Sequence, residues 1–193
     1  YIKYQRKEKV DKVGHRNSFV EYNIYKEYFL NLKKPELVSA ICKIQEYSIA
    51  STETHPIRLS LNSKFVDAAY WKLMSFSFID GKPFSQEDFD SELKKVVITE
   101  STARQLFKDT KNVNFKPFTI TGIIKDASPV FEYAFADIYM PFTTYKDYQY
   151  YQYHVLFLAK NKEDFKTIED EIREVERKYN AIDSEWTLSF HGP

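Results

Sequence analysis

The sequence has one cysteine, four glycines, no excess charge of either sign and no long apolar run. The single thiol, Cys42, cannot form an internal disulfide, which also excludes zinc sites built from several cysteines. The 28 Lys and Arg residues balance 28 Asp and Glu residues, so the basic excess of a nucleic-acid-binding domain is missing. The longest apolar stretch, residues 155–159, is far shorter than the roughly 20 residues that span a bilayer. We therefore expect no nucleic-acid partner and no membrane-spanning segment within these residues.

Motifs for catalysis or cofactor binding are also missing. No phosphate loop, dinucleotide fingerprint or nucleophile elbow is present. Cys42 lies in an apolar run and is expected to be a small buried side chain, and the acidic clusters at 87–88 and 169–171 are typical of solvated helix faces. The histidines have no spacing typical of a metal site; they are His15, His55, His154 and His191. We expect no catalytic, cofactor-binding or metal-binding residue in this domain.

What is present is enough chain for a core. A length of 193 residues suits one domain or two small ones, and the 16 Phe and 15 Tyr supply large apolar side chains. The sequence starts without Met, and its first residues have neither the apolar stretch nor the cleavage site of a signal peptide. We expect these residues to be a piece of a larger protein.

Both ends of the chain follow the order strand, helix, strand. Extended segments at 1–10 and 36–49 flank a helix predicted over 17–35, with a capping box at Ser18 and Glu21 and a stop at Pro35. Near the other end, a strand at 153–159, a helix capped by Asn161 and a strand at 186–190 are predicted. The apolar positions keep a helical period, at Phe19, Tyr22, Tyr25, Phe29 and Leu32 in the first helix and at Phe165, Ile168, Ile172, Val175 and Tyr179 in the second. Together the two ends predict a split βαβ pair.

The middle of the chain predicts a second α+β unit. It starts with a strand over 57–65, in which Lys64 belongs to the side predicted to face solvent. A short helix capped by Asp67 follows. A turn at 80–83, a capping box at Ser85 and Asp88, a strand at 95–99, a helix at 100–107 and strands at 118–126 and 136–142 follow, with Gly122 marking a bulge or close packing. The fold class is therefore α+β. Residues 1–56 and 143–193 form an outer subdomain, and residues 57–142 form a second subdomain inserted into it.

The segment 145–153 contains five tyrosines in nine residues. Tyr145, Tyr148, Tyr150 and Tyr151 form a candidate surface for a sugar, a lipid headgroup or a partner protein, because tyrosine offers contact area at low entropic cost. The alternative, which we favour, is that these rings pack over the junction of the two subdomains.

Five segments in the middle of the chain carry a family resemblance. Residues 66–73, 81–89, 95–107, 118–126 and 138–142 resemble, in the same order, the conserved blocks of MacB-like periplasmic core domains. The segment Leu-Lys-Lys-Pro-Glu-Leu-Val-Ser at 32–39 is similar to a stretch in related permeases. One departure is that residues 108–117 contain no glycine, where the family usually has a glycine-containing hairpin. The resemblance implies a porter-like outer subdomain and a sabre-like inserted one.

The resemblance further implies the extracytoplasmic domain of an ABC transporter permease of the MacB/FtsX type, on the periplasmic side of the inner membrane. The expected partners are the protein's own transmembrane helices, a cytoplasmic ATPase subunit, a second permease copy, and a periplasmic adaptor or lipoprotein. The domain would need no cofactor and would couple ATP-driven helix motion to export or mechanotransmission. An extracytoplasmic domain that senses a ligand or partner is the alternative.

Overall fold

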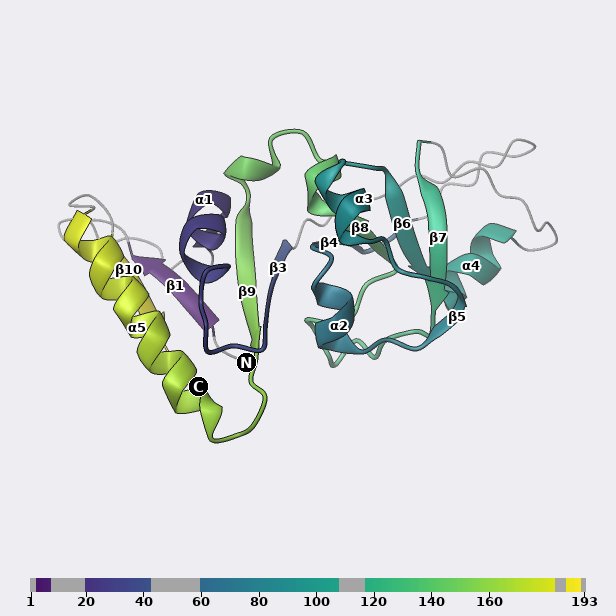
Figure 1. Ribbon diagram of the computed structural model, residues 1–193. Coiled ribbons are helices and arrows are strands. Elements are labelled where there is room, and N and C mark those ends of the chain that lie inside the picture. The colour runs from purple at the N-terminus through teal and green to yellow at the C-terminus, as the bar shows by residue number, and fades with distance from the viewer. Residues whose placement is uncertain (1–2, 8–19, 43–59, 108–116, 183–186, 192–193) are drawn as a thin grey trace. The chain divides into compact units, whose positions relative to one another are not determined.

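The computed structural model describes residues 3–7, 20–42, 60–107, 117–182 and 187–191 (Figure 1). The chain divides into two compact units: the first unit comprises residues 1–41 and 147–193, and the second unit comprises residues 42–146. Of the boundaries predicted from the sequence, residue 56 lies outside the described residues, and residue 142 begins the short 3-10 helix η2 (Phe142–Thr144). The porter-like and sabre-like assignments stay predictions. Each unit mixes strands and helices, and the predicted α+β class is confirmed.

The strand pairs within the first unit are antiparallel: β1 (Lys3–Lys7) with β10 (Thr187–His191), and β9 (Gln152–Leu158) with β2 (Val20–Glu21) and β3 (Leu37–Cys42). β9 lies between β2 and β3, because it pairs with both. Its central position explains the continuous apolar run predicted as a strand buried on two faces. In the pairing of β1 with β10, Lys3 lies opposite His191. The first and last strands of the chain are therefore neighbours.

The first helix of this unit is shorter than predicted and only partly α-helical. α1 (Tyr22–Ile24) continues into a π-helix, η1 (Tyr25–Phe29), which closes with the Leu30 amide donating to the Tyr25 carbonyl over 3.0 Å. Ile24, Tyr25 and Phe29 are buried, because the wider π turn brings residues four and five apart onto one face. The prediction of a helix reaching Pro35 is wrong. The predicted cap, Ser18, lies outside the described residues.

The long helix of this unit is α5 (Asp164–Ile182), which begins three residues after the predicted cap. Asn161 was predicted to accept a hydrogen bond from the first turn of the helix. Instead its backbone amide donates to the Asp164 carboxylate at 3.0 Å. Three of the five predicted apolar positions are buried: Ile168, Ile172 and Val175. At the other end, Asn180 donates to the carbonyl of Leu188 at 2.9 Å and accepts from its amide at 2.6 Å. This pair of hydrogen bonds ties α5 to β10.

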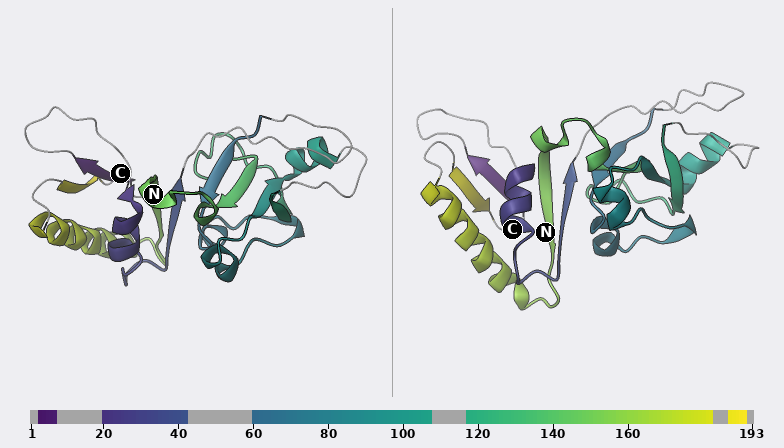
Figure 2. Two further views of the ribbon diagram at one scale, coloured as in Figure 1. Left: turned by 90° about the horizontal axis from the view of Figure 1, so that it is seen from above. Right: turned by 45° about the horizontal axis from the view of Figure 1, so that its top comes forward.

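In the described part of the second unit, five strands follow the order β4-β8-β6-β7-β5, and Figure 2 shows them from two further sides. They span Ser63–Val66 (β4), Phe78–Gly81 (β5), Lys95–Thr99 (β6), Thr119–Ile124 (β7) and Ile138–Pro141 (β8). β4 runs parallel to β8 and β6 parallel to β7, whereas β8 with β6 and β7 with β5 are antiparallel. The core includes β6, whose residues Val96, Val97 and Ile98 have no exposed surface. β6 has the bounds that the sequence predicted.

The solvent-facing side predicted for the strand at 57–65 is found only in part, because Ser60 and Asn62 are exposed as predicted and Lys64 is buried. The described part forms a strand only from Ser63, and all four residues of β4 are buried, including Lys64, which is 3% exposed. Lys64 can be buried because its ammonium donates two hydrogen bonds to backbone carbonyls elsewhere in the unit, as detailed below. From Ser63 onward, a strand with both faces covered replaces the predicted half-exposed one.

The helices of the second unit are α2 (Tyr70–Met74), α3 (Gln86–Asp90) and α4 (Glu100–Phe107). The capping box is confirmed, since the Asp88 amide donates to Ser85 Oγ at 3.1 Å and the Ser85 amide donates to the Asp88 carboxylate at 2.9 Å. The Asp67 carboxylate accepts from the Tyr70 amide at 3.0 Å, as expected of a residue that starts α2. These local signals were readable because both partners lie within four residues.

The bulge predicted at Gly122 is also confirmed. The register of β6 against β7 shifts between Val96 and Val97, and Thr121 is the residue left over. A Cβ on Gly122 would lie 2.7 Å from the Lys82 carbonyl oxygen, so a side chain at this position would force the backbone to shift. The turn predicted at 80–83 begins later than expected, because its first two residues complete β5. None of the helices among the described residues is long and apolar enough to cross a membrane.

Candidate functional site

The tyrosine-rich segment divides between the two units, and Tyr145 and Tyr148 each pack against a ring of their own unit. Tyr145 belongs to the second unit, where its half-buried ring meets the edge of Phe65 at a centroid distance of 5.3 Å. Tyr148 belongs to the first unit and packs edge-on against Tyr22 at 5.0 Å. Tyr22 also lies 6.1 Å from the buried ring of Tyr153. Most of this aromatic area is thus used for packing.

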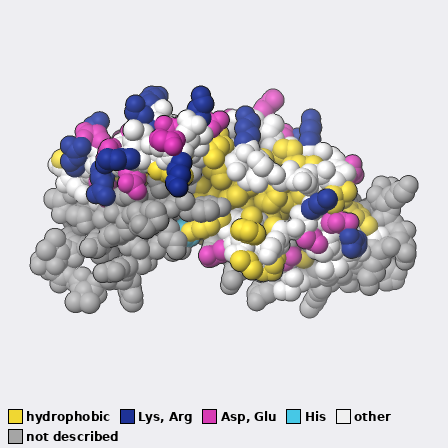
Figure 3. All heavy atoms as spheres, turned by 90° about the horizontal axis from the view of Figure 1, so that it is seen from below, with side chains coloured by type: hydrophobic (Ala, Val, Ile, Leu, Met, Phe, Trp, Pro, Cys, Tyr) yellow, Lys and Arg dark blue, Asp and Glu magenta, His cyan; other side chains and the backbone are white. Residues whose placement is uncertain are grey.

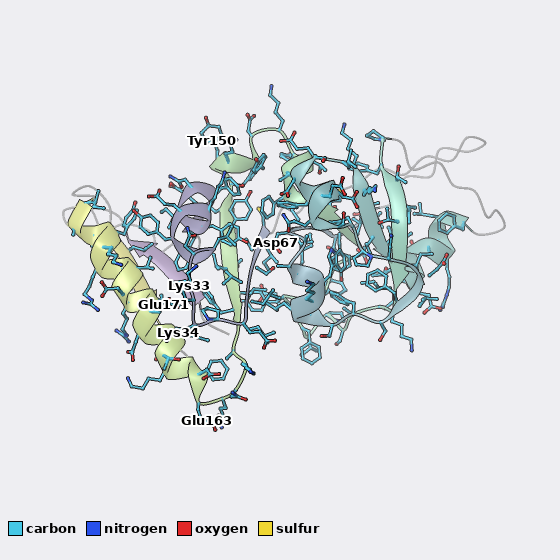
Figure 4. The ribbon with its side chains drawn as sticks, in the orientation of Figure 1. Lys33, Lys34, Asp67, Tyr150, Glu163 and Glu171 are labelled. Atoms are coloured by element: carbon cyan, nitrogen blue, oxygen red, sulfur yellow. The ribbon has the colours of Figure 1, made fainter. Side chains whose placement is uncertain are left out.

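Tyr150 is the tyrosine of this segment that projects into solvent. It ends the 3-10 helix η3 (Tyr148–Tyr150), is 83% exposed and points away from the first unit in Figure 4. The Tyr153 hydroxyl donates to the Tyr148 carbonyl at 2.5 Å, which fixes the short helix on β9. Tyr151 is half-buried. The ligand surface stays a prediction, and in the structure its exposed area comes mainly from Tyr150.

Of the histidines considered for chemistry, His15 and His55 lie outside the described residues. Across the described ranges, no three His, Cys, Asp or Glu side chains come together in a way that could hold a metal ion. Cys42 is buried, as predicted, and burial raises the pKa of its thiol to about 12, so it stays protonated at neutral pH. A protonated buried thiol packs as a small apolar side chain.

A second surface feature was not predicted from the sequence. The β7–β8 loop (residues 125–137) carries Val130 and Phe131, which are 85% and 66% exposed. We call these two side chains the apolar tip. The loop runs along the lower edge of the second unit in Figure 1, and the view from below in Figure 3 shows hydrophobic side chains gathered over this unit. The sequence does contain a signal for this feature: a Val-Phe pair directly follows Ser-Pro between two predicted strands.

Buried side chains hold this loop from beneath. The Lys64 ammonium donates to the carbonyls of Glu132 and Tyr133, both at 2.7 Å. The Tyr70 hydroxyl donates to the Tyr133 carbonyl at 2.8 Å, and the Tyr139 hydroxyl donates to the Ala134 carbonyl at 2.6 Å. Three successive carbonyls are therefore bound by donors from β4, α2 and β8.

The pKa values of one of these donors, Tyr139, and of one acid of the loop, Asp126, are shifted. Burial raises the pKa of Tyr139, so its hydroxyl remains a donor at any physiological pH. Burial opposes ionisation of Asp126, but hydrogen bonds from Ser101 and Thr99 outweigh it and lower the pKa of that carboxyl. Asp126, Glu132 and Asp137 make the loop acidic, and residues 126–137 contain no Lys or Arg. Residues 126–137, which include the apolar tip, therefore carry a formal excess of negative charge, and Lys125 directly precedes them.

A third feature lies in the first unit, between the segment after η1 and α5. The amides of Lys33 and Lys34 both donate to the Glu171 carboxylate, at 2.9 Å in each case (Figure 4). Two consecutive backbone donors hold one carboxylate more firmly than a surface ion pair does. This contact fixes the chain that enters β3 onto the middle of α5.

Solved structures place this fold among extracytoplasmic domains of transport permeases. The extracellular domain of the noncanonic ABC-type transporter YknZ from Gram-positive bacteria is similar with a TM-score of 0.68, at 14% identity, covering 97% of this chain and 98% of that one. The periplasmic region of MacB from Actinobacillus actinomycetemcomitans is similar with a TM-score of 0.64, at 13% identity, covering 98% and 88%. A domain of a putative permease protein from Porphyromonas gingivalis is similar with a TM-score of 0.68, at 14% identity, covering 100% of this chain and 89% of that one. A comparison with curated proteins found no match.

The sequence itself determines the family. The family model for the MacB-like periplasmic core domain matches residues 14–175, which is most of the chain. The chain therefore belongs to the MacB-like periplasmic core domain family, and the resemblance seen in the five sequence blocks is confirmed. At 13–14% identity the solved structures add the fold and nothing further.

Proposed function

We propose that this chain is the extracytoplasmic domain of an ABC transporter permease in the cytoplasmic membrane, and that it performs no catalysis of its own. Its work is mechanical: it couples ATP-driven movement of membrane helices to export or mechanotransmission on the outer side of that membrane. Membership of the MacB-like periplasmic core domain family carries the proposal. The ATP is hydrolysed by a cytoplasmic ATPase, and the domain needs no cofactor.

The first unit has the connections that a coupling element requires. Pairing of β1 with β10 brings Lys3 next to His191, so membrane helices joined to both ends would attach to neighbouring strands. Asn180 ties β10 to α5, and Glu171 ties α5 to the segment before β3. A displacement applied at the two terminal strands would therefore be passed along α5 through directed hydrogen bonds.

The expected assembly is a permease dimer with its ATPase, in contact with a periplasmic adaptor or lipoprotein. The alternative function, a sensor that binds a ligand or partner, is favoured by one observation, the 83% exposure of Tyr150. It predicts saturable binding of a glycan or peptide that is lost when Tyr148, Tyr150 and Tyr151 are replaced together. A coupling domain needs no such binding.

The experiment that tests coupling measures distances in the complete transporter. A spin label at Lys178→Cys, on an exposed position of α5, is placed in a Cys42→Ala background, and the permease is reconstituted in lipid with its ATPase. Pulsed dipolar spectroscopy then compares the distance between the two copies with ADP and with a non-hydrolysable ATP analogue. We expect a shifted distance distribution. The same distribution in both nucleotide states would refute coupling, and no dipolar signal would refute the dimer.

A further inference from the structure

We propose that the apolar tip, Val130 and Phe131, is a docking element that inserts into an apolar pocket with a basic rim on a partner polypeptide. Both side chains are mostly exposed, at 85% and 66%, and they are adjacent at the turn of the β7–β8 loop. Exposed Phe next to Val is costly to leave in water and is typical of interface anchors. This inference goes beyond the proposed function, because coupling alone requires no contact at this loop.

The loop is held in one conformation before any partner binds. The tip follows a turn in which the Phe131 amide donates to the Ser128 carbonyl at 2.9 Å, and the Phe131 carbonyl accepts from the amides of Ala134 and Phe135 at 2.8 Å each. Beneath it, Lys64 fixes the next two carbonyls. A loop anchored in this way loses little conformational freedom on binding, and such preorganisation raises affinity. It also prevents the tip from folding back to cover its own apolar area.

The charges around the tip favour a protein over a lipid surface. Residues 126–137 of the loop have Asp126, Glu132 and Asp137 and no basic side chain. Lys125, directly before them, and the buried Lys64 ammonium offset two of these three charges, so one negative charge remains in excess. Apolar loops that insert into membranes are flanked by basic residues, which the anionic headgroups attract. An acidic flank is repelled there, whereas it matches a pocket rimmed by Lys or Arg. The occupant is therefore a polypeptide of complementary charge.

The test uses the full-length permease in its native cells, with a photo-crosslinking amino acid at position 130. Illumination is followed by mass spectrometry of the adduct. We expect a crosslink to one polypeptide of another kind, within a peptide that combines apolar residues with Lys or Arg. Crosslinking to lipid, to a second copy of this chain or to nothing would each overturn the proposal. The same amino acid at Gln105, an exposed position on α4 of the same unit, is the matched control and should give no such adduct.

Two substitutions test the chemistry of the contact. Phe131→Ser should lower the crosslink yield at position 130, and the measured affinity for the identified partner should fall about 30-fold, as for an interface anchor. Glu132→Lys should also weaken binding, most strongly at low salt. Binding that is unchanged by Phe131→Ser, or strengthened by Glu132→Lys, would refute the pocket described here. The spin-label distances of the coupling experiment are read in the same variants, so failure of docking and failure of coupling are distinguishable.

Discussion

Replacement of Lys64 by methionine tests whether the buried ammonium holds the β7–β8 loop. Methionine keeps an unbranched stem of similar volume and removes two charge-assisted hydrogen bonds, each with a donor–acceptor distance of 2.7 Å. Such bonds contribute about 1.5–3 kcal/mol each, and relief of the buried charge returns part of that sum. We expect the free energy of unfolding to fall by about 2 kcal/mol, since the Tyr70 hydroxyl still binds one of the two carbonyls.

The assay combines urea unfolding with hydrogen exchange. Trp71, buried among the aromatic rings of the second unit, reports unfolding of that unit by fluorescence when the other tryptophan, Trp186, is replaced by Phe in all variants. The amides of Ala134 and Phe135, which are hydrogen-bonded inside the loop, should exchange about 10- to 100-fold faster in Lys64→Met, because a tenfold change corresponds to about 1.4 kcal/mol. Lys72→Met, at an exposed position of α2, is the control and should change stability by less than about 0.5 kcal/mol.

Two outcomes would refute this reasoning. If Lys64→Met changes neither the unfolding free energy nor the exchange of the loop amides, the ammonium does not hold the loop. If the unfolding free energy falls while the loop amides keep their protection relative to the core, Lys64 stabilises the sheet rather than the loop. In either case the preorganisation argued for the apolar tip would lose its cause.

Three further predictions concern single positions. Gly122→Ala should destabilise the second unit by about 1–3 kcal/mol in urea unfolding, because the added Cβ would lie 2.7 Å from the Lys82 carbonyl oxygen. A change below about 0.5 kcal/mol would show that the backbone at the bulge shifts without cost. Burial raises the pKa of the Cys42 thiol from 9.0 to about 12, so the folded state favours the neutral thiol. The contribution of this thiol to stability should be constant below pH 9 and fall as the pH rises toward 12. Cys42→Ala should make the fall measured in urea unfolding smaller, and the part that remains comes from groups such as Tyr139, whose pKa burial also raises. Hydrogen bonds from Lys95 and the Ser85 backbone lower the pKa of Asp88, so its contribution is present above the ordinary value of 3.8 and is lost as the pH falls below it. Asp88→Asn should therefore cost about 1 kcal/mol at pH 7, and the difference from the unmodified protein should shrink in acid; a constant difference would contradict the assignment.

Local signals in the sequence predicted the elements whose stabilising partners are close along the chain. β6 and α4 have the predicted bounds, and the capping box at Ser85 has the predicted geometry. The segments that carry the family resemblance include these same elements, and the family assignment was confirmed. The π-helical turn at Tyr25–Phe29 was missed because an apolar period of three or four residues does not reveal a single wider turn.

Features that depend on distant contacts could not be predicted in this way. Lys64 alternates with apolar neighbours and therefore looked solvent-facing, but its partners are carbonyls of the loop nearly 70 residues later. The exposure of Val130 and Phe131, two apolar side chains of the same loop, could likewise not be read from the sequence. The tyrosine segment was visible in the sequence, yet composition alone could not tell the packed ring of Tyr148 from the projecting ring of Tyr150.

Pairing of β1 with β10 has a consequence for how the domain bears force. The strands are antiparallel, and Lys3 and His191 lie at the same end of the ladder. Pulling these two residues apart would unzip the ladder one rung at a time, which is the weak loading direction for a β pair, since the hydrogen bonds fail in sequence rather than together. Displacing both residues in the same direction loads no rung. The β1–β10 pair would thus transmit movements that displace both ends of the domain together, and it would open when the two ends are pulled apart.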